Sequence, residues 1–133
     1  MRIVCRELRD RLRDAARCCE HCRKPLAVGT AEIAHIYTKG HGGGGWLDIP
    51  ANLVALGSAF GCSCHCRQHQ QNENPSTDDL KAIVARRYKT TVDAVIAELD
   101  RALNQLHKGD KYLCPWTRYY WFKTQTGYEW GYE

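Results

Sequence analysis

The feature that most constrains this chain is its cysteine content, because eight of its 133 residues are cysteine and most fall into two clusters. The clusters lie about 40 residues apart, and each has histidines alongside, which is typical of a zinc site. Disulfides between near neighbours within one cluster would be strained. The sequence therefore predicts a zinc-stapled fold rather than a secreted disulfide framework. The two clusters and the two isolated cysteines are Cys18, Cys19 and Cys22, then Cys62, Cys64 and Cys66, and finally Cys5 and Cys114.

Length and composition predict one domain over residues 1–133. The 44% of hydrophobic residues is enough for a modest core, and the 26% of charged residues is ordinary for a folded protein. No apolar run reaches the roughly 18 residues of a transmembrane helix, and the arginine-rich N-terminus lacks the apolar stretch of a secretory signal. We therefore expect a cytoplasmic protein whose thiols stay reduced.

Positive charge is concentrated at the N-terminus. Residues 1–24 contain eight basic and four acidic side chains, and this surplus of four equals the net charge of +4 of the whole chain. A local basic arm suits contact with the phosphates of nucleic acid. The alternative is a solvated helix face with internal arginine–aspartate pairs, and the charge pattern fits either interpretation equally well.

The hydrophobic pattern predicts short elements in the first half of the chain. Residues 2–17 carry an apolar stripe at helical spacing, so we expect a basic helical arm at residues 1–17. The composition of residues 31–38 and of residues 52–56 predicts two short strands. The glycine-rich run at 40–45 predicts a loop between them, because glycine adds reach but no core. The polar sequence after the second cysteine cluster predicts an exposed helix.

Residues 75–109 carry clearer helix signals. Ser76 is a good N-cap with Asp79 three residues on, which predicts a helix to about residue 88. The threonines at 90–91 predict the cap of a second helix, which ends near residue 108 before Gly109.

The tail at residues 110–133 is rich in aromatic side chains. We expect it to pack back over the small core, with a strand pair that turns near residues 125–127. Two alternatives remain for its aromatic surface, namely a homodimer contact and stacking on unpaired bases. Its nine aromatics are Tyr112, Trp116, Tyr119, Tyr120, Trp121, Phe122, Tyr128, Trp130 and Tyr132.

The centre of the chain carries a set of short motifs in a definite order. They are Cys19-x-x-Cys22, Glu32-Ile-Ala-His35-Ile, the glycine-rich loop, Asn52-Leu-Val-Ala-Leu, and Cys62-Ser-Cys64-His65 followed by His69. Over residues 18–69 this order resembles the HNH endonuclease family, whose usual form is C-x-x-C, a strand ending in x-H-I, and then N-L-x-x-L-C-x-x-C-H. The resemblance implies an α+β fold with a small zinc-stapled ββα-metal core at residues 18–74, flanked by N- and C-terminal helices and the aromatic-rich C-terminal tail.

The resemblance also implies roles for individual residues. His35, at the end of the first strand, would be the general base, because neutral imidazole can take a proton from water near physiological pH. Asn52 would orient that base or ligate a catalytic metal, and His65 would bind the same metal. His69 lies four residues on, so it shares the helical face of His65 and is a further candidate ligand.

Each of these roles has a structural alternative. His35 could be a satisfied core histidine, and Asn52 could simply close the turn before its strand. His65 and His69 could both belong to the zinc site.

The ligands of the structural zinc involve a choice within each cluster. The first cluster offers a pair with the usual knuckle spacing, and Cys18 is the local competitor. In the second cluster the five-residue insertion at 57–61 makes the register ambiguous: a pair with Cys64 keeps a cysteine beside His65, whereas a pair with Cys66 has helical i,i+4 spacing. We prefer the former. The expected ligands of the structural Zn²⁺ are Cys19, Cys22, Cys62 and Cys64.

One departure from the family pattern removes a ligand from the expected catalytic metal site. Ala34 stands where many family members carry an aspartate or histidine ligand. A metal held by Asn52, His65 and His69 would be Mg²⁺ or Mn²⁺, or a borderline ion such as Zn²⁺ or Ni²⁺ if the histidines dominate.

The expected function is that of a metal-dependent endonuclease, encoded by a phage or its bacterial host. It would hydrolyse DNA phosphodiester bonds, with the basic arm contacting the phosphate backbone. The alternative is a non-catalytic, zinc-dependent nucleic-acid-binding module in which the cysteines and histidines are all structural.

Overall fold

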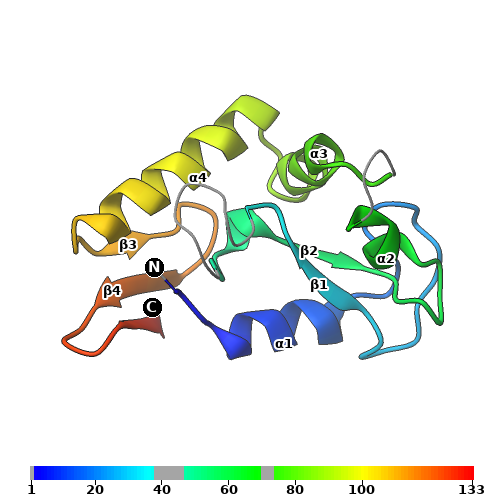
Figure 1. The fold of residues 1–133 in the computed structure, drawn as a ribbon, viewed down its shortest axis with the longest axis horizontal. Coiled ribbons are helices and arrows are strands. Elements are labelled where there is room, and N and C mark those ends of the chain that lie inside the picture. The colour runs from blue at the N-terminus through cyan, green and yellow to red at the C-terminus, as the bar shows by residue number, and fades with distance from the viewer. Residues whose placement is uncertain (1, 38–46, 70–73) are drawn as a thin grey trace.

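In the computed structural model the chain folds into helices and two small antiparallel sheets (Figure 1). The structure describes residues 2–37, 47–69 and 74–133. The mixed α+β class expected from the sequence is therefore confirmed. The glycine-rich run that we expected to form a loop lies outside the described residues. Among the helices of the described ranges, none is both long and apolar enough to cross a membrane.

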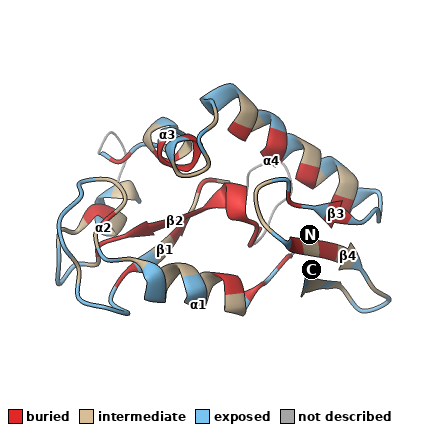
Figure 2. Ribbon diagram, turned by 180° about the vertical axis from the view of Figure 1, so that it is seen from behind, coloured by how far each residue is buried: buried red, intermediate tan, exposed pale blue. Residues whose placement is uncertain are grey.

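A two-stranded antiparallel sheet lies at the centre of the fold. β1 (Glu32–His35) pairs with β2 (Leu53–Leu56), and His35 lies opposite Leu53 in the register. A single 3-10 turn, η1 (Pro50–Asn52), leads into β2, so this strand begins one residue later than expected. Every residue of β2 is buried, as Figure 2 shows by its continuous red colour.

Helices cover this sheet on both sides (Figure 1). α1 (Arg6–Ala15) packs on both strands from one side, and α3 (Thr77–Arg87) contacts β2 from the other. The five-residue α2 (Cys64–Gln68) contacts β1, and the long α4 (Val92–His107) packs on α3 and η1. The apolar sequence of β2 is explained by this double cover, because neither of its faces meets solvent.

The caps expected for α3 and α4 are confirmed. The Ser76 hydroxyl accepts the Asp79 amide, and the Asp79 carboxylate accepts the Ser76 amide, which completes a capping box. The Thr91 hydroxyl accepts the amide of Ala94 at the start of α4. Gly109, with φ of 81°, follows the end of α4, where a left-handed backbone is most easily supplied by glycine.

The N-terminal helix begins later than the sequence pattern predicts, at Arg6. The preceding residues are extended and run beside residues 47–48. The Asp48 amide donates to the Ile3 carbonyl at 3.0 Å, and the Cys5 amide donates to Asp48 Oδ2 at 2.8 Å. Because the side chain of Asp48 binds the Cys5 amide, residues 2–5 are held in an extended conformation. They therefore cannot form a further turn of α1.

The C-terminal tail forms a three-stranded antiparallel sheet in the order β3–β4–β5. β4 (Tyr119–Lys123) and β5 (Tyr128–Tyr132) are the expected strand pair, joined by a turn at residues 124–127. β3 (Tyr112–Leu113) has no counterpart in the sequence prediction. It is only two residues long, which is too short for a hydrophobic pattern to indicate.

One face of this tail sheet packs back onto the rest of the protein. The side chains of Tyr112, Tyr119 and Trp121 are buried in the common core. The guanidinium of Arg11 on α1 lies 5.8 Å from the centre of the Tyr119 ring. The tail therefore contributes to the core and contacts α1 through Arg11.

Candidate metal centre and active site

Four cysteine thiols come together where the two cysteine clusters meet. Their sulfur atoms all lie within 4.8 Å of one another. Two of the thiols are buried, one is half-buried and one is exposed. Four thiols from two chain segments are the donor set of a structural zinc site, so this cluster could hold such an ion. The four residues are Cys19, Cys22, Cys62 and Cys64.

The competing cysteines lie outside this group. Cys18 pairs with Pro25 across the first turn, and Cys66 is exposed on α2. The structure thus assembles the set that was preferred from the sequence, with Cys64 rather than Cys66 from the second cluster. Within the described ranges, it is the one group of three or more cysteine, histidine or acidic residues placed to share an ion.

Burial and the hydrogen bonds among these thiols give them different pKa values. Burial raises the pKa of the Cys64 thiol to about 12, with a further contribution from its hydrogen bond to Cys62. Burial also raises the pKa of Cys62, but hydrogen bonds from the amide and thiol of Cys64 outweigh that effect and lower it to about 7. Burial raises the pKa of Cys19. Without a cation, the site therefore holds a mixture of thiolate and thiol near neutral pH.

Glu20 ties the first cysteine turn to the sheet and to α3. Its amide donates to the Ala55 carbonyl at 3.0 Å, and its Oε1 accepts the Ala55 amide at 2.8 Å. Arg87 of α3 holds both carboxylate oxygens, at 2.7 and 3.1 Å, and also donates to the Leu53 carbonyl. The free edge of β2 is thereby closed, and the cysteine turn is fixed against it.

His35 is paired with a buried carboxylate. Its Nε2 lies 2.7 Å from Asp48 Oδ1, and the Asp48 side chain is 0% exposed. The second oxygen of Asp48 accepts the Cys5 amide and lies 3.0 Å from Arg9 Nε on α1. This network fixes the orientation of the imidazole ring, because Asp48 is itself held from two sides.

Asn52 uses its side chain to bind backbone. Its Oδ1 accepts the Tyr37 amide at 2.6 Å, and its Nδ2 donates to the carbonyls of Tyr37 and Leu47 at 3.1 and 2.9 Å. The residue is fully buried in η1. It therefore joins the chain just after β1 to the chain just before η1, which fits an orienting or turn-closing role better than a ligand role.

His65 on α2 and His69, the residue that caps the C-terminus of this helix, face each other. Their Nε2 atoms are 3.2 Å apart, and His65 Nδ1 lies 3.2 Å from Glu32 Oε1 on β1. The i,i+4 spacing along α2 and its C-cap brings the two rings together, as the sequence predicted. Alternation along β1 places Glu32 on the same strand face as Ala34, so a carboxylate lies on the face where Ala34 itself offers no ligand.

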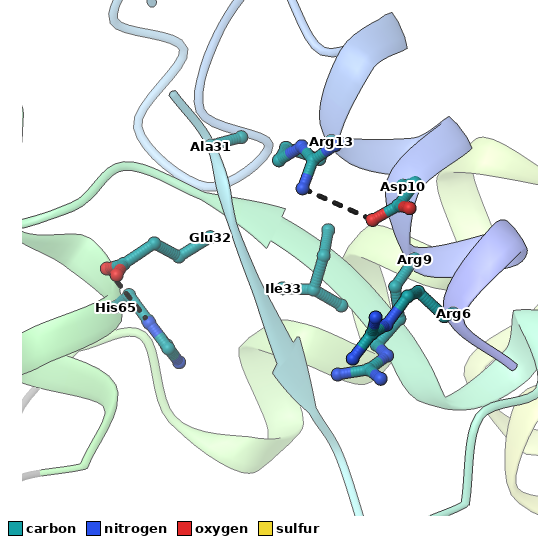
Figure 3. Close-up of a pocket in the computed structure, with 8 residues that line it drawn as sticks. All are labelled: Arg6, Arg9, Asp10, Arg13, Ala31, Glu32, Ile33 and His65. Atoms are coloured by element: carbon teal, nitrogen blue, oxygen red, sulfur yellow. Dashed lines mark hydrogen bonds and ion pairs between the residues drawn. The ribbon is translucent and has the colours of Figure 1, made fainter. Parts of the chain in front are cut away.

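β1 separates His65 from Arg6 and Arg9 of α1 (Figure 3). Figure 3 shows Glu32 and His65 on one side of the strand, and the guanidinium groups of Arg6 and Arg9 on the other beside Ile33. Together they line a groove of about 430 Å³. Among the described residues Arg6 has no ion-pair partner, so the groove is electropositive on its α1 side.

Sequence reasoning missed three residues of this region. Asp48 and Glu32 are single acids outside any spacing rule, and the partner of Glu20 lies 67 positions away in Arg87. An acid two residues from Ala34 on a strand is the one cue that could have pointed to Glu32.

Comparison with known proteins adds nothing to this geometry. No protein-family model, curated protein or solved structure matches the chain. Function is therefore inferred from the site alone.

Proposed function

We propose that this protein is a metal-dependent endonuclease of the HNH type that hydrolyses DNA phosphodiester bonds. The observation that carries this inference lies at the two ends of β1. His35 at its end is paired with buried Asp48, and Glu32 at its start contacts His65, which in turn contacts His69. Phosphodiester hydrolysis needs a base to activate water and a cation to stabilise the negative charge that develops. β1 thus carries the candidate base at its end, and its first residue contacts a candidate cation ligand.

Asp48 prepares His35 to act as the base. A carboxylate beside Nε2 favours the neutral tautomer that carries its proton on Nε2, so the lone pair is on Nδ1. Nδ1 then takes a proton from the attacking water, and Asp48 stabilises the imidazolium that forms. Arg9 and the Cys5 amide hold the Asp48 side chain in place.

His65 and His69 are the residues that would hold the catalytic cation. Their Nε2 atoms already converge, and Glu32 orients the His65 ring through Nδ1. A bound divalent ion would polarise the phosphate and stabilise the leaving oxygen. Two imidazoles favour Mn²⁺, or a borderline ion such as Zn²⁺ or Ni²⁺, over Mg²⁺. We assign Asn52 to holding the end of β1, because its oxygen accepts the Tyr37 amide.

A structural Zn²⁺ at the four cysteines would fix the position of α2. This helix has only five residues and no side-chain cap, so it would not be stable alone. Cys64 is its first residue and directly precedes His65. A closed site with four thiolates takes no part in the chemistry, but it holds the histidine pair against β1.

The arginine side of the groove supports DNA as the substrate. Arg6, Arg9 and Arg13 project from successive turns of α1 into the groove beside β1 (Figure 3). Arginines on one helix face give phosphate contacts that do not depend on sequence. The internal pair of Arg13 with Asp10 reduces this charge only in part, since Arg6 stays without an acidic partner in the described ranges.

Plasmid nicking tests the proposed function directly. Zinc-loaded protein with added Mn²⁺ should nick supercoiled DNA, and EDTA should stop the reaction. His35→Ala should abolish nicking with unchanged circular dichroism and zinc content. His107→Ala is the matched control, because His107 is an exposed histidine at the end of α4, and it should retain full activity. Nicking by His35→Ala at the wild-type rate would show that His35 is not the base.

A second candidate function is non-catalytic binding of nucleic acid. The bonding of the Asn52 amide to backbone favours it, because Asn52 is then a structural residue and not a ligand. In that case the protein binds duplex DNA, and no divalent ion elicits nicking.

A further inference from the structure

Phe60 is the most exposed large apolar side chain among the described residues. Its exposed fraction is 104%, so its side chain is fully exposed. It lies in the five-residue segment 57–61 that interrupts the resemblance to the HNH motif, two positions before Cys62. A phenylalanine in this state gains no burial energy from folding, so its ring is available to a partner.

The loop that carries Phe60 is well ordered by hydrogen bonds. The Ser58 carbonyl accepts the amides of Gly61 and Ser63 at 3.0 and 2.9 Å, and the Ser58 hydroxyl accepts the Phe60 amide at 3.3 Å. A Cβ at Gly57 would collide with the Cys62 sulfur, so the loop starts tightly against the cysteine cluster. The backbone that carries Phe60 is thus held in one conformation.

Positive charge surrounds the base of this loop. A pocket beside it is lined by two of the cluster cysteines and by Arg23, Lys24 and Arg67, with no acidic residue in its wall. Arg67 is anchored there, because it donates to the Cys62 carbonyl and to the Cys64 sulfur. Arg23 and Lys24 have exposed side chains and no ion pair with any residue in the described ranges.

The loop and the basic turn are neighbours in space. The side chain of Leu26 would lie 3.4 Å from a Cβ at Gly57 and at Gly61, so the chain after Lys24 packs directly under the loop. Figure 1 shows this end of the molecule beside α2, away from the tail sheet. An exposed aromatic ring and two unpaired cations therefore share one surface.

We propose that Phe60 inserts into the base stack of bound DNA while Arg23 and Lys24 contact the flanking phosphates, an inference that rests on the proposed function. Apolar side chains act as wedges between base steps, and aromatic rings stack on any base because every base has a π-face. The cations offset the phosphate charge on both sides of the opened step. The occupant is nucleic acid rather than an apolar protein surface, because the neighbouring pocket is lined by Arg23, Lys24 and Arg67 and by no acidic residue.

Fluorescence of 2-aminopurine placed in a short duplex tests this insertion. Zinc-loaded protein without added Mn²⁺ should bind the duplex and raise the fluorescence, because an unstacked 2-aminopurine is no longer quenched. Phe60→Ala should bind about tenfold more weakly and lose the fluorescence rise, since stacking of one base is worth that order of affinity. Leu113→Ala is the matched control, because Leu113 is 46% exposed on the tail sheet, and it should change neither readout.

Salt dependence tests the two cations. The double variant Arg23→Ala, Lys24→Ala should weaken binding to every sequence and lower the slope of log affinity against log salt by about two. An unchanged slope would remove both residues from the interface.

The failures of the two ideas are distinguishable. A wild-type protein that binds and nicks DNA, with equal affinity and fluorescence in Phe60→Ala, would overturn the wedge and leave the nuclease. Loss of binding to anionic phospholipid vesicles in Phe60→Ala, with DNA affinity intact, would assign Phe60 to membranes and also overturn it. A wild-type protein without DNA affinity would overturn both.

Discussion

His35 Nε2 lies 2.7 Å from Asp48 Oδ1, and Asp48 is completely buried between β1, α1 and the extended N-terminal residues. A buried carboxylate that holds an imidazole by one nitrogen determines which nitrogen carries the proton. The candidate base thus depends on Asp48 as much as on its own ring.

Asp48→Asn is expected to lower kcat about 100-fold with little change in KM, because the amide neither selects the tautomer nor stabilises the imidazolium. Long-range proton–nitrogen NMR spectra should show the Nε2–H tautomer in the wild type and a mixture in the variant. Thermal melting monitors the fold, since the change also leaves Arg9 without its partner. An unaltered tautomer together with an unaltered rate would remove Asp48 from the mechanism.

Glu32→Gln is expected to weaken Mn²⁺ binding about tenfold, because the His65 ring loses its charged partner at Nδ1. Isothermal titration of the zinc-loaded protein with Mn²⁺ measures the effect. Glu129→Gln, an exposed acid on β5, is the control and should bind Mn²⁺ like the wild type. Equal affinities in all three proteins would show that Glu32 has no influence on the ion.

Removal of the structural metal is expected to disorder α2. Cys64→Ser should reduce bound zinc from one ion per chain to a small fraction, and amide exchange should become fast in α2. Cys66→Ser provides the comparison, because Cys66 is exposed and lies outside the group of four. If Cys66→Ser lost the zinc and Cys64→Ser kept it, Cys66 and not Cys64 would be the fourth ligand.

Zinc binding at pH 7 is expected to release protons from Cys19 and Cys64. Their thiol pKa values are raised, that of Cys64 to about 12, so both are protonated before the ion binds. Protons therefore compete with zinc, and the apparent zinc affinity must fall as the pH is lowered. Calorimetry in buffers of different ionisation enthalpy counts the protons released. Release of fewer than two would contradict this view of the thiols.

Glu20→Gln is expected to lower the free energy of unfolding by about 2 kcal/mol, because Arg87 then lacks its charged partner at the closed edge of β2. The loss is smaller than for a fully buried pair, since the side chains of Arg87 and Glu20 are 17% and 24% exposed. Urea denaturation measures it. The surface variant Asp78→Asn should be neutral, and an equal loss there would show that Glu20 has no special role.

Local spacing made part of this site predictable. The C-x-x-C turn indicated Cys19 and Cys22, and the i,i+4 rule brought His65 beside His69. These relationships extend over one turn of chain, so the sequence expresses them directly. The caps of α3 and α4 were predictable for the same reason.

Relationships over longer distances were not predictable. Asp48 reaches His35 across 13 positions, and Arg87 reaches Glu20 across 67. Only the tertiary fold brings such partners together, and a single acid or arginine has no periodicity that would mark it. The late start of α1 has the same cause, because it depends on the bond between the Cys5 amide and Asp48.

Cleavage of a defined DNA duplex in ¹⁸O-labelled water tests the central claim most directly. With Mn²⁺ and zinc-loaded protein, mass spectrometry should find one ¹⁸O atom in the 5′-phosphate of the product, because His35 activates a water molecule that attacks phosphorus. His35→Ala should yield no product. Product without the label, or an absence of cleavage with any divalent ion, would contradict the assignment of this protein as a metal-dependent phosphodiester hydrolase.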